Sequence, residues 1–199
     1  MRSAVLFCLI ATLCALVTAC VSPKPIKYYR IDIPVSQPSA GATSRVTLAV
    51  GNIECPPIMR DGRILYQVGE HEVGAYEYHR WVESPDRVVQ NSLVRLLRSS
   101  GRYSSVDIQR SGVTADYIVG GKIYEFSEID KPEIHTRVSI EIELRDAKTG
   151  RIVWTRLYTR EEPVSGKEVA NVVDSLDQNL RRGLSEIVAG LHQYLGATA

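Results

Sequence analysis

The chain has 199 residues, and its 24 lysines and arginines against 23 acidic residues give a net charge of +1 with histidine neutral. A charge this close to zero provides no general attraction to nucleic acid or anionic lipid, so no nucleic-acid partner is expected. Hydrophobic residues make up 44% and charged residues 24%, which is the composition of a folded chain and not of a disordered one. The length predicts one domain, or at most two small ones.

The first twenty residues are typical of a bacterial lipoprotein signal peptide. Arg2 precedes an uncharged run over 4–19, which is shorter than the roughly 20 residues that span a bilayer. The run ends Leu16-Val17-Thr18-Ala19-Cys20, and small residues before a cysteine resemble a lipobox. We therefore predict a signal peptide over 1–19 and a lipid anchor on Cys20. An ordinary signal peptide followed by an ordinary cysteine is the alternative.

The cysteine count agrees with this interpretation. Cys8 and Cys14 lie inside the predicted signal peptide, which leaves Cys55 as the free thiol of the mature chain. The mature chain then has no internal disulfide and depends on its hydrophobic core for stability. Two prolines follow Cys55, and no histidine is near it, so a buried inert thiol is favoured over a nucleophile.

After the cysteine, residues 20–27 contain Pro23 and Pro25 and are predicted to form an extended tether. Hydrophobic alternation and turn residues then predict a series of strands, with a loop over 35–44 and hairpin turns at 69–72 and 146–150. The predicted strands are 27–33, 45–53, 63–68, 73–78, 106–108, 115–129, 137–145 and 152–160.

Two of these strands carry further detail. The segment 137–145 alternates most clearly, with one face made of Val138, Ile140, Ile142 and Leu144. The pair Gly120-Gly121 inside the preceding strand predicts a bulge or a bend.

Two amphipathic helices are predicted. The first starts at Ser84-Pro85-Asp86, where Ser84 can cap the helix, and it ends at Gly101. The second has a capping-box pattern at Ser165 and Glu168, followed by an apolar stripe over 169–195. Gly183 in its middle predicts a close approach to a strand. Packing on the sheet is favoured over a coiled-coil or membrane-surface helix, because the polar face is mixed in sign.

The order of elements predicts an α+β fold, with a mostly antiparallel sheet and two amphipathic helices packed on one face. We expect residues 28–199 to form a single domain.

The sequence contains no motif of a known catalytic or metal site, and no P-loop or dinucleotide fingerprint. Its histidines, at positions 71, 79, 135 and 192, are scattered. His71 and His79 flank one hairpin and could meet in space, although exposed histidines are the favoured interpretation. We therefore predict a protein that is not an enzyme, without a metal or cofactor other than the covalent lipid on Cys20.

An aromatic and aliphatic group without a chemical partner lies in the 63–78 hairpin and its flanks. Its members are Met59, Ile64, Tyr66, Tyr76, Tyr78 and Trp81. Either both faces of the hairpin are buried in the fold, or one face binds another protein, since tyrosine, tryptophan and methionine are enriched at interfaces. The candidate partner-binding residues are Tyr66, Tyr76, Tyr78 and Trp81.

These features occur in an order that resembles the ABC-type transport auxiliary lipoprotein family, which includes the paraquat-inducible protein C lipoproteins. The resemblance covers essentially the whole mature chain and is most specific over 59–85. Cys55 departs from the family pattern, and the resemblance implies no role for it. The matching segments are the lipobox at Cys20, Tyr28-Tyr29-Arg30-Ile31-Asp32, Pro56-Pro57, Met59-Arg60-Asp61-Gly62-Arg63-Ile64-Leu65-Tyr66, Tyr76-Glu77-Tyr78-His79-Arg80-Trp81-Val82-Glu83-Ser84-Pro85 and residues 93–103.

The resemblance implies an auxiliary component of an intermembrane lipid transport system. Its partners would be an MCE-domain protein, ABC transporter or permease components, or both, and by analogy with the family the chain itself could form a homo-oligomeric ring. Val21 after Cys20 implies sorting to the outer membrane, on the side facing the periplasm, because an aspartate there is the usual retention signal. A periplasmic lipid carrier and a structural envelope lipoprotein, associated with peptidoglycan or a secretion machine, are the alternatives.

Overall fold

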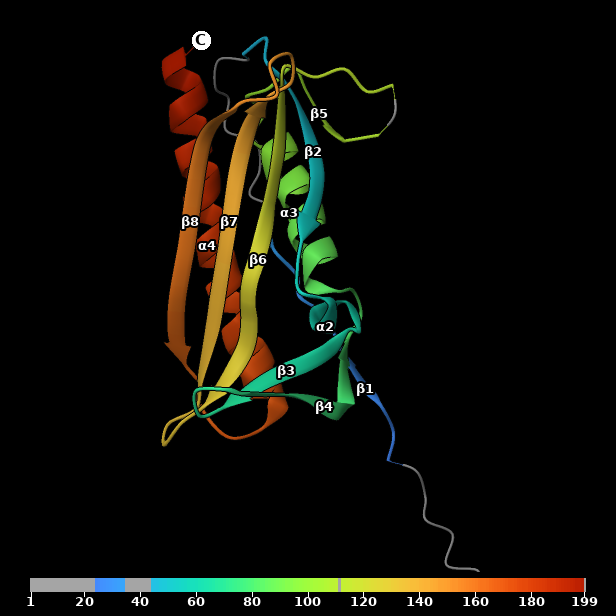
Figure 1. Cartoon of the computed structure of the whole chain (residues 1–199), viewed down its shortest axis with the longest axis vertical. Helices are drawn as coiled ribbons and strands as arrows, with labels where there is room; N and C mark the ends of the chain where they lie inside the picture. The colour runs from blue at the N-terminus through green and yellow to red at the C-terminus, as the bar shows by residue number, and fades with distance from the viewer. Residues whose placement is uncertain (1–23, 35–43, 111, 199) are drawn as a thin grey trace, which may run out of the picture.

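The computed structural model describes residues 24–34, 44–110 and 112–198 (Figure 1). The predicted signal peptide, Cys20 and most of the predicted 35–44 loop lie outside these described residues. The elements in chain order are β1 (Lys27–Tyr29), β2 (Thr47–Glu54), α2 (Pro57–Arg60), β3 (Arg63–Val68), β4 (Glu72–Trp81), α3 (Pro85–Ser99), β5 (Ser105–Ile108), β6 (Tyr117–Asp130), β7 (His135–Asp146), β8 (Ile152–Pro163) and α4 (Val169–Thr198).

The strands form one sheet with the long strand β6 at its centre. One edge of β6 pairs with β7, which pairs in turn with β8. The other edge is shared, because β2 pairs with the first part of β6 and β3 with the last part. The sheet continues from β3 to β4 and β1, and from β2 to β5 (Figure 1).

The α+β class is confirmed, and the pairing within the sheet is mixed. The longest pairings, β6–β7 and β7–β8, are antiparallel, as is β3–β4. Among the described strands, β1–β4, β2–β5, β2–β6 and β3–β6 pair in parallel. These parallel partners are distant in sequence, so hydrophobic alternation within each strand carried no information on their relative direction.

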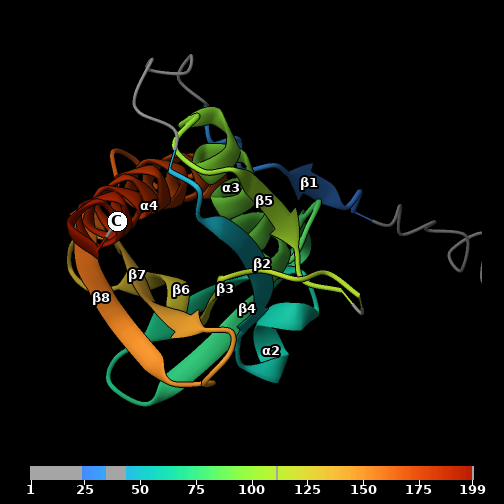
Figure 2. The same cartoon turned by 90° about the horizontal axis from the view of Figure 1, so that it is seen from above.

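The helices α3 and α4 lie against one face of the curved sheet, as predicted (Figures 1 and 2). The helix α4 packs mainly on β7 and β8, and α3 packs on β2 and β5. The apolar stripe of α4 meets the inward side chains of β7, and the core residues without exposed surface include Ile140, Ile142, Leu144, Leu176, Leu180, Leu184 and Ile187. No helix in the described ranges is both long enough and apolar enough to cross a membrane.

The predicted close approach at Gly183 is confirmed. A Cβ atom at this position would lie 2.7 Å from the ring of Tyr158 in β8. Asn179, one turn earlier, accepts a hydrogen bond from the Tyr158 hydroxyl at 2.7 Å and donates one to the Arg160 carbonyl at 3.0 Å. Glycine therefore lets α4 approach β8 closely enough for a buried amide to fasten the two together.

Three local predictions need correction. Ser84 precedes α3 but makes no side-chain capping bond. The helix α4 begins at Val169 and not at Ser165, because Gly166 has φ +117°, which lies outside the helical range, so the capping box is wrong. The first strand ends at Tyr29, and the chain continues in a non-strand conformation that buries Ile31 and Ile33 in the core.

The irregularity predicted at Gly120-Gly121 is present on one edge of β6 and lies beyond the glycines on the other edge. The pairing of β6 with β7 is continuous through both of them and shifts between Ile123 and Glu125. On the other edge of β6, the register shifts in β2 between Val50 and Ile53. Because Val50 pairs with Val119 and Ile53 with Gly121, this shift lies opposite Gly120, and the predicted irregularity is present on this edge of β6.

Candidate partner-binding surface

An aromatic cluster forms at the end of the sheet that carries β1, β3 and β4. Tyr66 and Tyr76 meet edge to face with ring centroids 5.1 Å apart, and Tyr76 meets His79 in the same way at 5.6 Å. Tyr29 of β1 stacks on His79 at 5.6 Å, and its hydroxyl lies 2.9 Å from Nδ1 of His79. The cluster therefore joins three strands through a chain of four rings.

A large bulge in β4 explains why these rings converge. Arg63 pairs with Arg80 and Leu65 pairs with Ala75, so residues 76–79 of β4 lie opposite Ile64 alone. The extra residues bend β4 away from β3 and aim its side chains in new directions. The strand β1 joins β4 at this bend, with Lys27 beside His79. Sequence alternation alone could not reveal a bulge of this size.

The candidate residues Tyr66, Tyr76, Tyr78 and Trp81 do not form one surface. Trp81 is only 5% exposed and packs on Phe126 with ring centroids 5.6 Å apart, so it lies in the core of the described fold. The three tyrosines are half-buried. Met59 and Ile64 of the same sequence group are also core residues. The buried interpretation therefore holds for the aliphatic members and Trp81, and the tyrosines remain available at the surface.

Tyr76 is held by a buried carboxylate. Its hydroxyl donates a hydrogen bond of 2.7 Å to Oε2 of Glu128, a β6 side chain that is buried. Burial raises the pKa of the Glu128 carboxyl, and the hydrogen bond from Tyr76 opposes this shift without cancelling it. Burial and then the bond to Glu128 raise the pKa of the Tyr76 phenol. Tyr76 therefore supports the cluster from inside, and its removal would leave Glu128 without this donor.

The raised pKa of Glu128 predicts a pH-dependent stability. The carboxyl holds its proton more tightly in the folded than in the unfolded state, so its effect on stability is most favourable in acid. Stability should then decline as the pH rises from the ordinary value of 4.5 through the folded pKa. Glu128→Gln keeps an acceptor for Tyr76 without a charge, so this variant should be more stable than the parent at about pH 7 and equal to it at about pH 4.

Urea unfolding of both proteins across this pH range measures the difference. Glu70→Gln is the matched control, since the Glu70 side chain is almost fully exposed at the hairpin turn. A constant difference between Glu128→Gln and the parent at all pH values would contradict the prediction.

The remaining candidate groups lie apart from one another. His71 is exposed at the hairpin turn beside Glu70, whereas His79 lies at the bend of β4, so the two histidines do not meet. Burial lowers the pKa of His79, with a further contribution from Lys27. Cys55 is buried, and burial raises the pKa of its thiol. The described part of the chain contains no group of three or more side chains suited to hold a metal ion.

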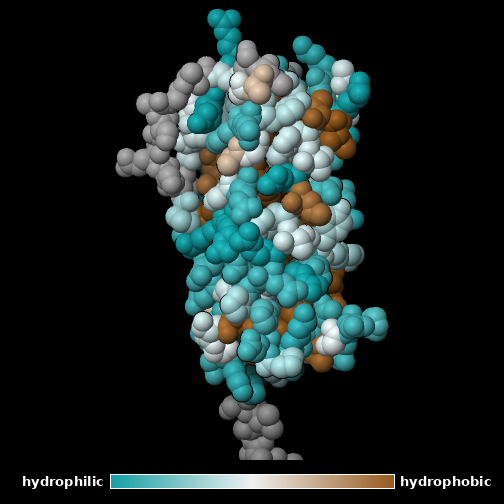
Figure 3. All heavy atoms as spheres, turned by 90° about the vertical axis from the view of Figure 1, so that its left-hand side faces the viewer, coloured by the Kyte–Doolittle hydropathy of each residue, from teal (hydrophilic) through white to brown (hydrophobic). Residues whose placement is uncertain are grey.

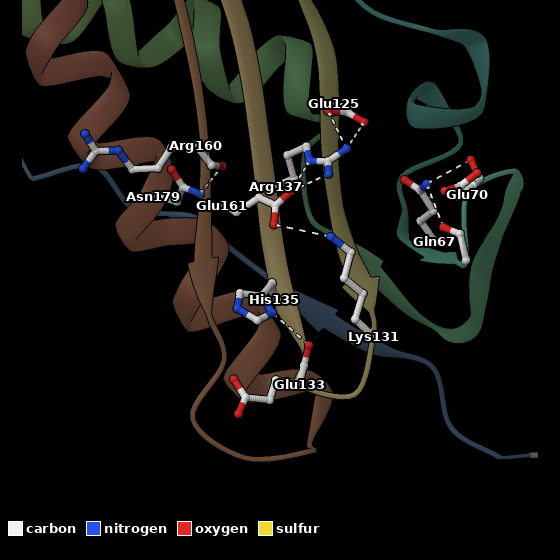
Figure 4. Close-up of polar contacts among 11 residues, drawn as sticks. Gln67, Glu70, Glu125, Lys131, Glu133, His135, Arg137, Arg160, Glu161 and Asn179 are labelled. Atoms are coloured by element: carbon white, nitrogen blue, oxygen red, sulfur yellow. Dashed lines mark hydrogen bonds and ion pairs between the residues drawn. The ribbon is translucent and has the colours of Figure 1, made fainter.

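The sheet face that points away from α3 and α4 carries a ladder of ion pairs. Arg137 of β7 lies between Glu125 of β6, at 3.1 Å, and Glu161 of β8, to which it also binds (Figure 4). Lys131 extends the ladder with a 3.7 Å contact to Glu161. The alternation of β7 predicts that this face is polar, but the cross-strand partners depend on the register of three strands.

A hollow of about 460 Å³ lies on the same open face. Gly120 and Gly51 leave its floor without side chains, and charged or polar groups form most of its walls. The lining includes Glu54, Gln109, Lys122, Tyr124, Glu141, Glu143 and Arg145. Such a lining suits polar or charged groups of a protein partner better than an acyl chain.

The side of the molecule formed by β8 and α4 is mostly hydrophilic, with separate small hydrophobic patches (Figure 3). Ile152 and Leu157 are the large apolar side chains of β8 that are more than half exposed. The strand β8 pairs with β7 alone among the described strands, so its other edge has no strand partner.

Solved structures with the same fold come from several sources. A protein from Xanthomonas campestris has 20% sequence identity and a TM-score of 0.75, covering 86% of this chain and 98% of its own. An uncharacterized protein has 17% identity and a TM-score of 0.67, with coverage of 84% and 99%. A hypothetical protein from Chlamydia trachomatis has 13% identity and a TM-score of 0.51, with coverage of 77% and 99%. At these identities the likeness shows the fold alone.

The comparison with curated proteins found no match. Residues 29–188 match the model of the family described as ABC-type transport auxiliary lipoprotein component. This range begins in β1, includes the aromatic cluster and the open sheet face, and ends within α4. The chain therefore belongs to the ABC-type transport auxiliary lipoprotein family.

Proposed function

We propose that the protein is the non-catalytic, outer-membrane-anchored component of an ABC- or MCE-type system that moves lipid between the two membranes of the envelope. Family membership over residues 29–188 carries this proposal, since it makes the chain an auxiliary lipoprotein of the cell envelope. The lipid on Cys20 would hold the domain at the periplasmic face of the outer membrane, and residues 28–199 would act as one docking domain.

The packing of the domain favours an adaptor over a lipid carrier. The space between the sheet and the two long helices is filled by apolar side chains from both layers, many of them without exposed surface. The described surface hollows of about 340, 460, 580 and 630 Å³ all have charged side chains in their linings. An acyl chain needs an apolar lining, so these hollows support contact with polar or charged partner groups instead.

The partner would be an MCE-domain protein or a transporter or permease component, and it would contact the aromatic cluster at the bend of β4. Tyr78 is not one of the four rings but lies in the same bulge next to His79, and it is the best residue to test this, because Tyr76 supports Glu128 and Trp81 lies in the core. The open edges of β8 and β5 suit head-to-tail contacts between copies, which close into a ring when the rotation permits.

Capture of the partner tests the proposal. The full-length tagged protein, crosslinked in intact envelopes and then purified, should recover an MCE-domain, ABC or permease protein. Tyr78→Ser should reduce the recovery several-fold, because a half-buried aromatic residue at an interface is a typical anchor. Tyr124→Ser, at an exposed tyrosine on the open sheet face, is the matched control and should retain it.

The other outcomes are equally specific. Loss of capture in Tyr124→Ser alone would move the partner site to the open sheet face. Recovery of no transport component from crosslinked envelopes would contradict the adaptor function. Phospholipid retained by the purified chain after delipidation would favour a carrier, and sedimentation with purified peptidoglycan would favour a structural role.

A further inference from the structure

The strand β1 lies at one end of the elongated molecule. In Figure 1 the chain enters at this end through β1, while the β7–β8 connection and the carboxyl terminus lie at the other end of the long axis. The sheet pairing agrees, because β1 joins β4, β4 joins β3, and β3 pairs with the last residues of β6. The β7–β8 connection follows Asp146, which pairs with Tyr117 at the first residue of β6.

This end carries exposed apolar and cationic side chains close to the point where the chain enters. Tyr28 is 63% exposed, Ile26 is 44% exposed and Val82, just after β4, is 48% exposed. The neighbouring Lys24 and Lys27 are also exposed. We call these five residues the β1 surface. The core of the described fold covers none of them, although burial of the three apolar side chains would be favourable.

The distance along the chain from Cys20 restricts where this surface can lie. Lys24 comes four positions after Cys20, and a fully extended chain spans at most about 3.6 Å per residue, or about 14 Å in all. A lipid on Cys20 places that residue at the bilayer surface. The Lys24 end of the β1 surface must then lie within about this distance of the headgroups, whereas the β7–β8 end can extend away from them.

We propose that the β1 surface rests on the bilayer and orients the domain, with anionic phospholipid headgroups as its occupant. This inference depends on the proposed lipid anchor at Cys20. Tyrosine is enriched at membrane–water interfaces, and lysine keeps its ammonium group among the headgroups while its stem lies on apolar surface. A basic side chain is attracted to an anionic leaflet only within a Debye length of about 8 Å, and the short tether lets Lys24, the lysine nearer the anchor, come within that range.

The composition of the surface sets the kind of contact. Glu77 and Glu83 are exposed in the same region and reduce its net positive charge. Electrostatic attraction between a large basic patch and the membrane is therefore not the main source of this contact. It combines three apolar side chains with two lysines next to the tether, and the attachment itself comes from the acyl chains.

The orientation can be measured on the intact lipidated protein in vesicles of three parts phosphatidylethanolamine to one part phosphatidylglycerol. Tyr28→Cys and, as the distal control, Lys148→Cys each introduce one exposed thiol for an NBD fluorophore, since Cys55 is buried. The label at position 28 should emit at a shorter wavelength than the label at position 148. Its quenching constant for aqueous iodide should be several-fold lower. The label at position 148 should behave as in free solution.

A charge variant tests the role of the lysines. Lys24→Glu with Lys27→Glu should restore iodide quenching at position 28 while the protein still floats with the vesicles. Lys148→Glu is the matched control and should change neither signal. Vesicles of phosphatidylcholine alone, which carry no net charge, should also weaken the protection at position 28.

Each contrary outcome is distinct. If the protein does not float with the vesicles and the thiol of Cys20 reacts with the fluorophore, Cys20 carries no lipid. This result would contradict both the proposed anchor and this inference. Protein that floats but shows equal quenching at positions 28 and 148 would overturn the inference alone. Protection at position 28 that falls as the protein is diluted among vesicles would assign the β1 surface to a second copy of the chain.

Discussion

Replacing Gly121 with alanine is expected to destabilise the protein by about 3 kcal/mol, the upper part of the usual range for overpacking a rigid interior. A Cβ atom here would lie 2.2 Å from the carbonyl oxygen of Glu141 and 2.7 Å from Cδ1 of Ile142. Both atoms belong to β7, which is held by β6 on one side and β8 on the other. Because one of the clashing atoms is backbone in a central strand, a side-chain rotation cannot relieve the contact.

The neighbouring Gly120 is the matched control. A Cβ atom at Gly120 would meet only the Glu143 side chain, at 3.8 Å, which is an ordinary van der Waals distance. Gly120→Ala should therefore raise the stability by about 0.5 kcal/mol, because alanine loses less backbone freedom on folding than glycine does. Urea unfolding followed by tryptophan fluorescence compares the two variants. Equal effects of the two substitutions would show that the distance between β6 and β7 at Gly121 is wrong.

Trp81→Ala should destabilise the fold by about 3–5 kcal/mol, the range for removing a large buried aromatic side chain. Trp81 fills the core beside Phe126 at the last residue of β4. Tyr28→Ala, at an exposed aromatic side chain of the strand paired with β4, should change the stability by less than about 0.5 kcal/mol. Far-UV circular dichroism in a urea gradient measures both values.

If Trp81→Ala were as stable as the parent, Trp81 would not be a core residue. It would then be a candidate partner-binding residue again. With the expected loss, any reduction of partner capture in this variant would follow from unfolding. Interface mapping should therefore rely on Tyr78 and avoid Trp81. Substitution of Tyr76 has the same difficulty to a lesser degree, because Glu128 is buried against its hydroxyl.

Much of the local structure could be predicted from the sequence. The strand over 137–145 and the helical stripe over 169–195 follow from hydrophobic periods of two and of three to four residues, and the structure confirms both. The close approach at Gly183 was also predictable, since glycine in the middle of a long helix is unfavourable unless something lies against it. These signals are local, because each depends on residues within a few turns or a single strand.

The candidate site was less predictable. The hairpin and its tyrosines were visible in the sequence, but the bulge over 76–79 decides which of them reach the surface. The bulge changes which positions of β4 face the core. The alternation of inward and outward side chains that includes Tyr76 and Tyr78 therefore does not continue to Trp81. Glu128, which supports Tyr76, comes from a strand about fifty residues later and gave no local signal. The open-face ion ladder depends in the same way on the register of β6, β7 and β8.

The sequence by itself determined the types and approximate limits of most elements, the apolar faces of the two long helices, and the resemblance to the family, because propensity, periodicity and motifs are written along the chain. The tertiary structure alone decided the parallel pairings of β2 and β3 with β6, the burial of Trp81, and the position of β1 at one end of the molecule. These features arise from contacts between residues distant in sequence. Their energies depend on register and packing, which no short window of the chain contains.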